Sequence, residues 1–227
     1  MVMDGLLLSL GEYVHLFHYG FFIHHMSPHE SYQLSLHSFD NTVLFSSRKF
    51  LRTFSPGGNQ NQIIWLKGEP VTMVGRGGFL AVFYHESSPL VNKTQQLGYT
   101  LWDMADLRVV SRGSVSCLSR GSSLSWVGFS NDLSLMVMDS DGMLSMLFTT
   151  GQDNGDGNYI WEWTPVLDTI GLRKSSDDSH WPVTVHNGKL VCIPLKGGKT
   201  YPDANRRPVT TMLGLRMPFA KSVVSKK

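Results

Sequence analysis

The sequence predicts an all-β protein made of consecutive four-stranded antiparallel sheets. The clearest evidence lies in residues 123–148, where three short apolar segments are separated by two polar turns, Ser130-Asn131-Asp132 and Asp139-Ser140-Asp141-Gly142. Ser, Asn and Asp side chains hydrogen-bond to nearby backbone groups in turns, and glycine readily adopts a positive φ. Because these segments are too short and too closely spaced for helices, they predict a β-meander.

The same pattern recurs on both sides of this stretch. Residues 69–85 hold two apolar segments around Arg76-Gly77-Gly78, and residues 181–194 hold two around Asn187-Gly188. An Asn-Gly pair between apolar runs is the strongest short-range signal for a hairpin. Hairpins that recur about every 40 to 50 residues are typical of a β-propeller, in which each blade is a four-stranded meander.

The apolar segments can be placed along most of the chain. They give 13 or 14 strands, which is about three and a half blades, whereas a closed propeller needs at least four. We therefore expect an irregular segment over residues 1–40, a partial propeller over 41–219 and a tail over 220–227. The expected strands are 43–45, 49–54, 63–66, 71–74, 80–84, 99–104, 107–110, 125–129, 135–138, 144–148, 159–167, two within 181–194, and 208–215.

The first 40 residues differ from the rest, because they contain six of the nine histidines. Leu7, Leu10, Val14, Phe17 and Phe21 share one face of a helix, although part of this segment also fits a strand. A histidine metal site would need ligand spacings that are absent. The interpretations left open are an irregular aromatic segment and residues that come from a wrongly assigned start of the chain.

Composition indicates a globular domain and gives little support to several other classes. The 227 residues are 41% hydrophobic and 17% charged, and the formal net charge of +2 is too small to predict nucleic-acid binding by itself. The sequence contains neither an apolar run of membrane-helix length nor the pattern of a secretory signal, so we expect no membrane association. Cys117 and Cys192 lie in apolar surroundings and predict buried thiols rather than a disulfide.

The motifs that usually indicate an enzyme are not found. The glycines of residues 75–78 precede a strand, whereas a phosphate-binding loop precedes a helix. Asp139, Asp141 and Gly142 are similar to the start of a calcium loop, but apolar residues stand where its later acidic ligand should be. We therefore expect a hairpin turn there, and no catalytic, metal or cofactor-binding residues.

One cluster of basic residues is a candidate for contact with nucleic acid. It surrounds the single acidic residue Asp203 and extends over residues 189–216. Lysine and arginine can neutralise phosphates, but lysines on exposed strands also protect sheet edges from aggregation. The candidate contacts are Lys189, Lys196, Lys199, Arg206 and Arg207, with Arg216 nearby.

A series of short motifs resembles one family in order along the chain. Examples are FLRTF at 50–54, FLAVFYH at 79–85 and SWVGFS at 125–130. They resemble the second propeller, or middle domain, of the replisome scaffold known as minichromosome loss or chromosome transmission fidelity protein in fungi, and as WD-repeat and HMG-box DNA-binding protein in animals. The residues that carry the resemblance are Gly68, Pro70, Val71, Trp126, Gly128, Phe129, Asp139, Asp141, Gly142, Trp163, Pro165, Cys192 and Pro208.

The resemblance implies a WD40-like propeller in a nuclear, non-enzymatic scaffold. Members of this family resemble a hub whose second propeller has six blades and forms a homotrimer. A helical bundle after it captures peptides from GINS, a component of the replicative helicase, and from DNA polymerase alpha, which couples unwinding to priming and supports sister-chromatid cohesion. The first propeller, the opening blades of the second and the bundle have no counterpart in this sequence, so peptide capture is assigned to no residue here.

Two other functions are compatible with the residues. The first is a DNA-binding or chromatin-binding module that uses the basic residues of 189–216, whose binding should depend strongly on salt concentration. The second is a propeller that binds or hydrolyses a small molecule in its central channel. It would need polar groups on the inner strands, but residues 71–74 and 135–138 are mostly apolar.

Overall fold

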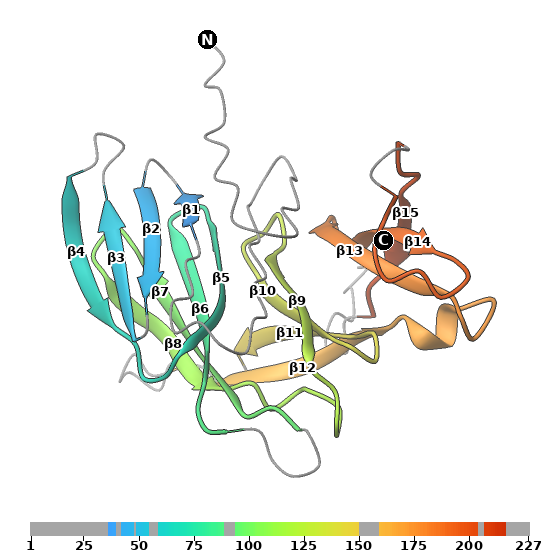
Figure 1. Cartoon of the computed structure of the whole chain (residues 1–227), viewed down its shortest axis with the longest axis horizontal. Coiled ribbons are helices and arrows are strands. Elements are labelled where there is room, and N and C mark those ends of the chain that lie inside the picture. Colours follow the sequence, from blue (N-terminus) through green and yellow to red (C-terminus); the bar gives the residue numbers. More distant parts are fainter. Residues whose placement is uncertain are drawn as a thin grey trace, which may run out of the picture.

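A computed structural model of the protein describes residues 36–39, 42–47, 49–54, 59–88, 94–149, 159–203 and 207–216, with side chains from Lys49 onward. This part of the chain forms fifteen β-strands and one short 3₁₀ helix, η1 (Ile170–Leu172), and the strands make four separate sheets (Figure 1). Each sheet is an antiparallel meander of strands that follow one another in sequence. We call the sheets the first to fourth blades.

The blades follow the order of the chain. The first blade contains β1 (Leu36–Phe39), β2 (Thr42–Ser47), β3 (Phe50–Phe54) and β4 (Gln60–Trp65). The second contains β5 (Pro70–Arg76), β6 (Phe79–His85), β7 (Leu97–Asp103) and β8 (Arg108–Ser114). The third contains β9 (Leu124–Phe129), β10 (Leu135–Asp139), β11 (Met143–Thr149) and β12 (Trp161–Asp168), and the fourth contains β13 (Ser179–His186), β14 (Lys189–Leu195) and β15 (Thr211–Gly214).

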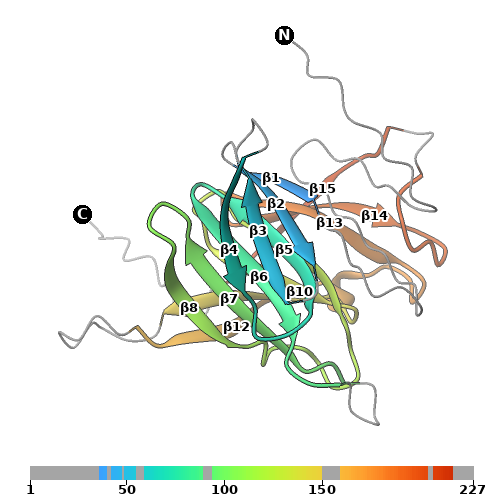
Figure 2. The ribbon, with the colours of Figure 1, turned by 60° about the vertical axis from the view of Figure 1, so that its left-hand side comes forward.

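The first strands of consecutive blades lie next to one another. β1 contacts β5, β5 contacts β9, and β9 contacts β13. A parallel bridge joins Ser130, just after β9, to Val185 on β13. Because the first strands lie next to one another while the later strands of each blade continue away from them, the arrangement is that of blades around a propeller axis. Figure 2 shows the strands of the first blade side by side in the order β1 to β4. The predicted all-β, propeller-like fold is confirmed.

The predicted turns also form, and their backbone angles explain the residues that occupy them. Asn187 and Gly188 both have positive φ values, 50° and 67°, as the tight hairpin between β13 and β14 requires. Gly78 and Gly142 have φ values of 86° and 79° in the β5–β6 and β10–β11 turns. Local sequence therefore determines where these hairpins reverse.

Several predicted boundaries differ from the structure. The last strand, expected over 208–215, is only the four residues of β15, because only these residues pair with β14. β4 begins at Gln60 rather than Ile63, and β13 begins at Ser179 rather than within 181–194. β1 was not predicted and lies within the segment 1–40, whereas residues 1–35, most of the 55–59 turn and the tail 220–227 lie outside the described residues.

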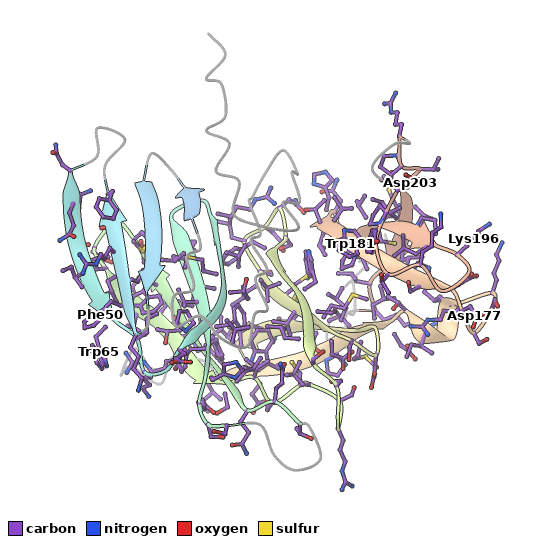
Figure 3. All side chains as sticks on the ribbon, in the orientation of Figure 1. Phe50, Trp65, Asp177, Trp181, Lys196 and Asp203 are labelled. Carbon is purple, nitrogen blue, oxygen red and sulfur yellow. The ribbon has the colours of Figure 1, made fainter. Side chains whose placement is uncertain are left out.

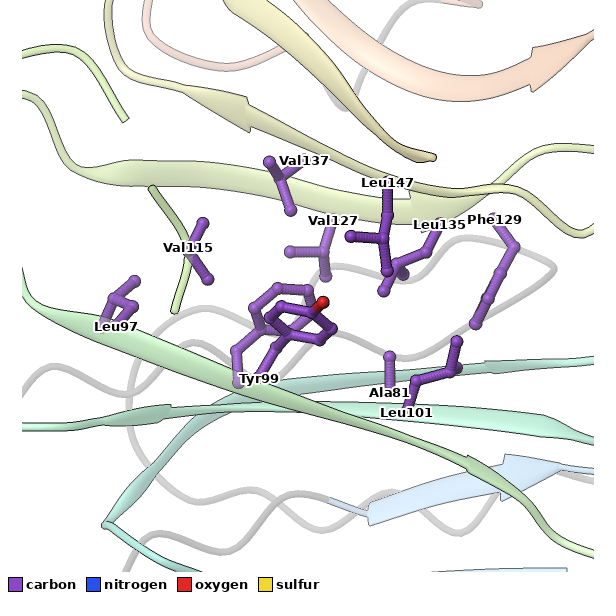
Figure 4. Packing of buried hydrophobic residues seen from close by; sticks show 11 residues of the cluster. Ala81, Leu97, Tyr99, Leu101, Val115, Val127, Phe129, Leu135, Val137 and Leu147 are labelled. Carbon is purple, nitrogen blue, oxygen red and sulfur yellow. The ribbon is translucent and has the colours of Figure 1, made fainter. Parts of the chain in front are cut away.

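Apolar side chains fill the space between neighbouring blades in three clusters. The largest joins the second and third blades, where Tyr99 and Leu101 face Val127, Phe129 and Leu147 (Figure 4). A second cluster joins the third and fourth blades, and a third joins the first and second. Each blade therefore depends on its neighbour to bury one of its faces.

Candidate functional site

The signature residues of the third blade fit together around β9. Trp126 and Gly128 are two positions apart on the same face of this strand, and the six-membered ring of the indole lies where a side chain at Gly128 would begin. Phe129, which follows, is buried in the cluster between the second and third blades. Glycine is needed here because it leaves room for the tryptophan ring.

Asp139 ties the end of β10 to two other segments. Its buried carboxylate accepts hydrogen bonds from the backbone N–H of Ser119 at 3.1 Å and of Met143 at 2.8 Å, and from the hydroxyl of Ser122 at 3.4 Å. Ser119 and Ser122 belong to the connection between the second and third blades. Asp141, in the same turn, is exposed. Hydrogen bonds within the protein therefore explain why an acidic residue stands at position 139, where the sequence resembles the start of a calcium loop.

Gly142 connects the same turn to the end of the blade. The hydroxyl of Thr169, just after β12, donates a hydrogen bond to the Gly142 carbonyl oxygen at 2.8 Å, and the Thr169 N–H donates to it at 3.0 Å. A side chain at Gly142 would overlap the Thr169 hydroxyl. The glycine is thus required both by its positive φ and by this close approach.

The signature residues of the second blade lie where it begins. A side chain at Gly68 would overlap the carbonyl oxygen of His85, at the end of β6. Pro70 is buried at the start of β5, and the pairing of β5 with β6 shifts register between Pro70 and Thr72, which makes Val71 the extra residue of a bulge. These residues determine how the chain enters the second blade.

Trp163 and Pro165 lie on β12, the outermost strand of the third blade. The Trp163 ring packs edge-on against Tyr99 of the second blade, with 5.2 Å between ring centroids. Its indole N–H is buried without a hydrogen-bond partner among the described residues. A proline is compatible with β12 because this strand is at the edge of its sheet.

Both cysteines are free thiols. Cys192 is fully buried between the third and fourth blades, as predicted, whereas Cys117 is only half-buried. Burial raises the pKa of each thiol to about 11, so both are protonated at neutral pH. Burial also raises the pKa of Tyr99, whose hydroxyl lies 2.8 Å from that of Ser111.

The signature residues thus lie at turns, bulges and blade interfaces in three different blades, and they do not converge on one site. Pro208 is the exception, because it is exposed and lines a surface pocket on the fourth blade. Within the described part of the chain, no three His, Cys, Asp or Glu side chains are grouped so that they could hold a metal ion. No described helix is long and apolar enough to cross a membrane.

The predicted basic cluster is divided between the two ends of the fourth blade. Lys189 begins β14 and pairs with Gly214, so it lies near Arg216. Lys196 and Lys199 follow the other end of β14, about 20 Å away for a seven-residue strand. Arg207 immediately precedes Pro208, which lines a pocket with these two lysines. Arg206 lies outside the described residues. The candidate nucleic-acid contacts therefore do not form one continuous surface.

The surface pocket lies at the end of β14 where Lys196 is found (Figure 3). It has a volume of about 280 Å³ and was not predicted from the sequence. Its apolar wall combines the last residues of β14 with the chain that leads into β15, and Asp203 is also part of its lining. The lining residues are Ile193, Pro194, Leu195, Lys196, Lys199, Pro202, Asp203, Pro208 and Val209.

The first blade exposes an apolar face. Leu51 on β3 and Ile64 on β4 pack toward the second blade, so their neighbours in each strand point the other way. Trp65 is 63% exposed and stacks edge-on against Phe50, while Ile63 is 51% exposed (Figure 3). We call Phe50, Ile63 and Trp65 the outer face of the first blade.

These consecutive sheets define a β-propeller protein. Most of its signature residues have structural roles at turns, bulges and blade interfaces. Residues 22–219 match the family described as Minichromosome loss protein, Mcl1, middle region, and the chain belongs to this family. It is 34% identical over 177 residues to Protein ENHANCER OF LHP1 1 of Arabidopsis thaliana, and 32% identical over 184 residues to WD repeat and HMG-box DNA-binding protein 1 of Homo sapiens. It is 34% identical over 128 residues to Minichromosome loss protein 1 of Schizosaccharomyces pombe.

The matched regions cover most of this chain but a small part of each relative. They span 78%, 80% and 54% of this chain, respectively, and 18%, 15% and 15% of the three relatives. Among solved structures, a crystal structure of a segment of HIRA has a TM-score of 0.38 and 16% identity, and the match covers 57% of this chain and 40% of that chain. That likeness is too low to support an argument about fold or function.

Proposed function

We propose that this chain is a propeller segment of a non-enzymatic scaffold that acts in the nucleus during DNA replication. The observation that carries this proposal is the family match over residues 22–219, together with relatives named for minichromosome loss and for DNA binding. In this proposal the chain forms a homotrimer and helps to couple the replicative helicase, through GINS, to DNA polymerase alpha. The same scaffold would support sister-chromatid cohesion.

The outer face of the first blade supports self-association. Each of the three pairs of adjacent blades packs apolar faces against each other. The outer face of the first blade also carries exposed apolar side chains, with Arg52 beside them, and no described blade packs against it. An exposed tryptophan stacked on a phenylalanine is the kind of aromatic anchor that is enriched at protein interfaces. Cyclic assembly of identical chains is a common way to cover such a surface.

A capture experiment tests the replication role. The tagged chain is expressed together with a full-length member of its family, and the captured material from S-phase nuclei is examined for that member, GINS and DNA polymerase alpha. We expect all three to be captured, because the chain reaches the two replication complexes by assembling with full-length copies. Capture of the full-length member without GINS or the polymerase would refute the coupling role, and capture of none would refute the assembly as well.

The geometry does not favour the alternative of a DNA-binding module over residues 189–216. Two separate groups of two or three cations can make only a few phosphate contacts, and each phosphate contact contributes little by itself. Asp203 also lines the pocket between the cations at one end of β14. Strong, salt-dependent binding of the purified chain to duplex DNA would nevertheless restore this alternative.

A further inference from the structure

The third strand of the fourth blade lies at an open sheet edge, whereas in each of the other blades a fourth strand pairs with the third. The first three blades each contain four strands, whereas the fourth contains three in the order β13-β14-β15. Among the described residues, no strand pairs with the outer side of β15. An open edge presents unpaired backbone donors and acceptors, and an extended chain can bind to it as an additional strand.

The strand register shows which backbone groups of β15 point outward. The N–H of Leu215 donates a hydrogen bond to the carbonyl oxygen of Gly188, on the β14 side, at 2.9 Å. Leu213, two residues earlier, is opposite Leu190, so its backbone groups also point toward β14. Because alternate residues of an antiparallel strand face opposite neighbours, the backbone groups of Met212 and Gly214 point to the open edge. The Met212 side chain is also 64% exposed.

The surface pocket lies just beyond the N-terminal end of β15. Pro208 and Val209 line the pocket and precede β15, so the pocket lies about 10 Å from Met212 along an extended chain. Val209 is 80% exposed, and Ile193 and Leu195 contribute apolar wall from β14. A strand bound at the edge would therefore bring a side chain three residues away to an apolar recess.

The charges beside the pocket favour an acidic occupant. Lys196 and Lys199 line the pocket together with a single acidic residue, Asp203, and neither lysine forms an ion pair with another described residue. Arg207 immediately precedes Pro208, which also lines the pocket, so cations outnumber acids at this end of β14. Opposite charges attract across interfaces and determine which partner binds in which register.

We propose that the open edge of β15 and the adjoining pocket bind a short extended peptide of a partner protein. The peptide adds a fourth strand to the blade, places one apolar side chain in the pocket, and presents acidic residues to Lys196 and Lys199. A second copy of this chain is a poorer occupant, because antiparallel pairing of two β15 strands would bring Lys196 and Lys199 of one copy close to Lys189 and Arg216 of the other. Residues 217–227 are also unsuitable because of their charge, since they contain three lysines and no acidic residue. This inference goes beyond the proposed replication role and does not depend on trimerisation.

The test uses the whole chain and a fluorescein-labelled synthetic peptide in which valine and leucine alternate with threonine and glutamates stand at both ends. Anisotropy should show binding, and charge reversal by Lys196→Glu with Lys199→Glu should weaken it about tenfold or more. Met212→Pro should also weaken it about tenfold, because it removes an outward N–H without touching the bonds to β14. Met212→Thr, which keeps the N–H, should retain binding within about twofold.

A matched proline on another edge is the control. Exposed Arg112 on the edge strand β8 also has its N–H directed away from the neighbouring strand β7, because Val115 donates to Leu97 and alternate residues of β8 face the open side. Arg112→Pro should leave peptide binding unchanged. Absence of binding, equal binding by a peptide with alternate backbone nitrogens methylated, or equal binding by the Met212→Pro variant would overturn the proposal. Tighter binding of a short DNA duplex that the lysine reversal abolishes would overturn it in favour of nucleic acid.

Discussion

The indole ring of Trp126 occupies the space above Gly128, so that the two residues fill one position on the face of β9. Gly128→Ala should therefore reduce the free energy of unfolding by about 2 kcal/mol, because the new methyl group must displace the buried edge of the ring. Urea denaturation followed by tryptophan fluorescence measures the change.

Gly113 on β8 provides the matched control for that substitution. Its nearest neighbour would be Cε1 of Tyr99 at 3.5 Å from the new methyl carbon, which is an ordinary contact. Gly113→Ala should be neutral or stabilising by up to about 1 kcal/mol, since alanine loses less backbone entropy on folding. Equal destabilisation by the two substitutions would show that Trp126 is not the reason for the glycine at 128.

Alanine substitutions at Gly142 and Gly188 distinguish the energetic cost of backbone strain from that of a steric overlap. Both have positive φ, 79° and 67°, but a side chain at Gly142 would meet the Thr169 hydroxyl, whereas one at Gly188 would meet nothing within 4 Å. Gly188→Ala should cost about 1 kcal/mol for the left-handed conformation alone. Gly142→Ala should cost at least about 1 kcal/mol more, because it also disturbs the hydrogen bond from Thr169. Equal losses of unfolding free energy would contradict this account.

Asp139 and Asp141 belong to the same turn but should respond very differently to substitution. Asp139→Ala leaves the half-buried N–H groups of Ser119 and Met143 without their acceptor, and we expect it to cost about 2 kcal/mol. Asp141→Ala, on an exposed residue, should change stability by less than about 0.5 kcal/mol. Chemical denaturation of both variants tests the assignment, which a large effect of Asp141→Ala would refute.

Burial of the two thiols predicts how stability depends on pH in the alkaline range. Folding raises the pKa of Cys117 and Cys192 from an ordinary value of 9.0 to about 11, so the unfolded chain releases these protons first. Their contribution to stability is therefore complete below pH 9 and is lost as the pH rises toward 11. A Cys117→Ala, Cys192→Ala variant should show a flatter decline in unfolding free energy over this range than the parent. An identical decline would contradict burial of the thiols.

Much of the fold could be predicted because its turns are encoded locally. Asn187-Gly188 and the Asp139 to Gly142 turn carry residues whose backbone preferences hardly depend on the rest of the protein. The strand limits were less predictable. β13 begins inside a polar segment because Ser179 pairs with Leu195, a residue distant in sequence. Such pairing depends on the neighbouring strand rather than on local composition.

The candidate site was less predictable than the fold. Lys189 and Lys196 are close in sequence, yet the extended form of β14 places them at opposite ends of the blade. The pocket needs Ile193 and Val209 to approach each other, which follows only from the pairing of β14 with β15. Three prolines near these strands, at 194, 202 and 208, were the available signal of an interrupted sheet edge.

The outer face of the first blade gives a direct prediction about assembly. If this face contributes to self-association, Trp65→Glu should lower the mass of the assembled species, because it places a charge within an apolar interface. Leu172→Glu, on the exposed helix η1 of another part of the chain, is the matched control and should not change the mass. Loss of assembly in both variants would indicate general misfolding rather than a specific interface.

The most direct test of the proposed assembly is size-exclusion chromatography with multi-angle light scattering on residues 1–227. We predict a mass near three times 25.4 kDa, about 76 kDa, for the parent chain. A folded species of 25.4 kDa at every concentration measured would contradict trimerisation by this chain.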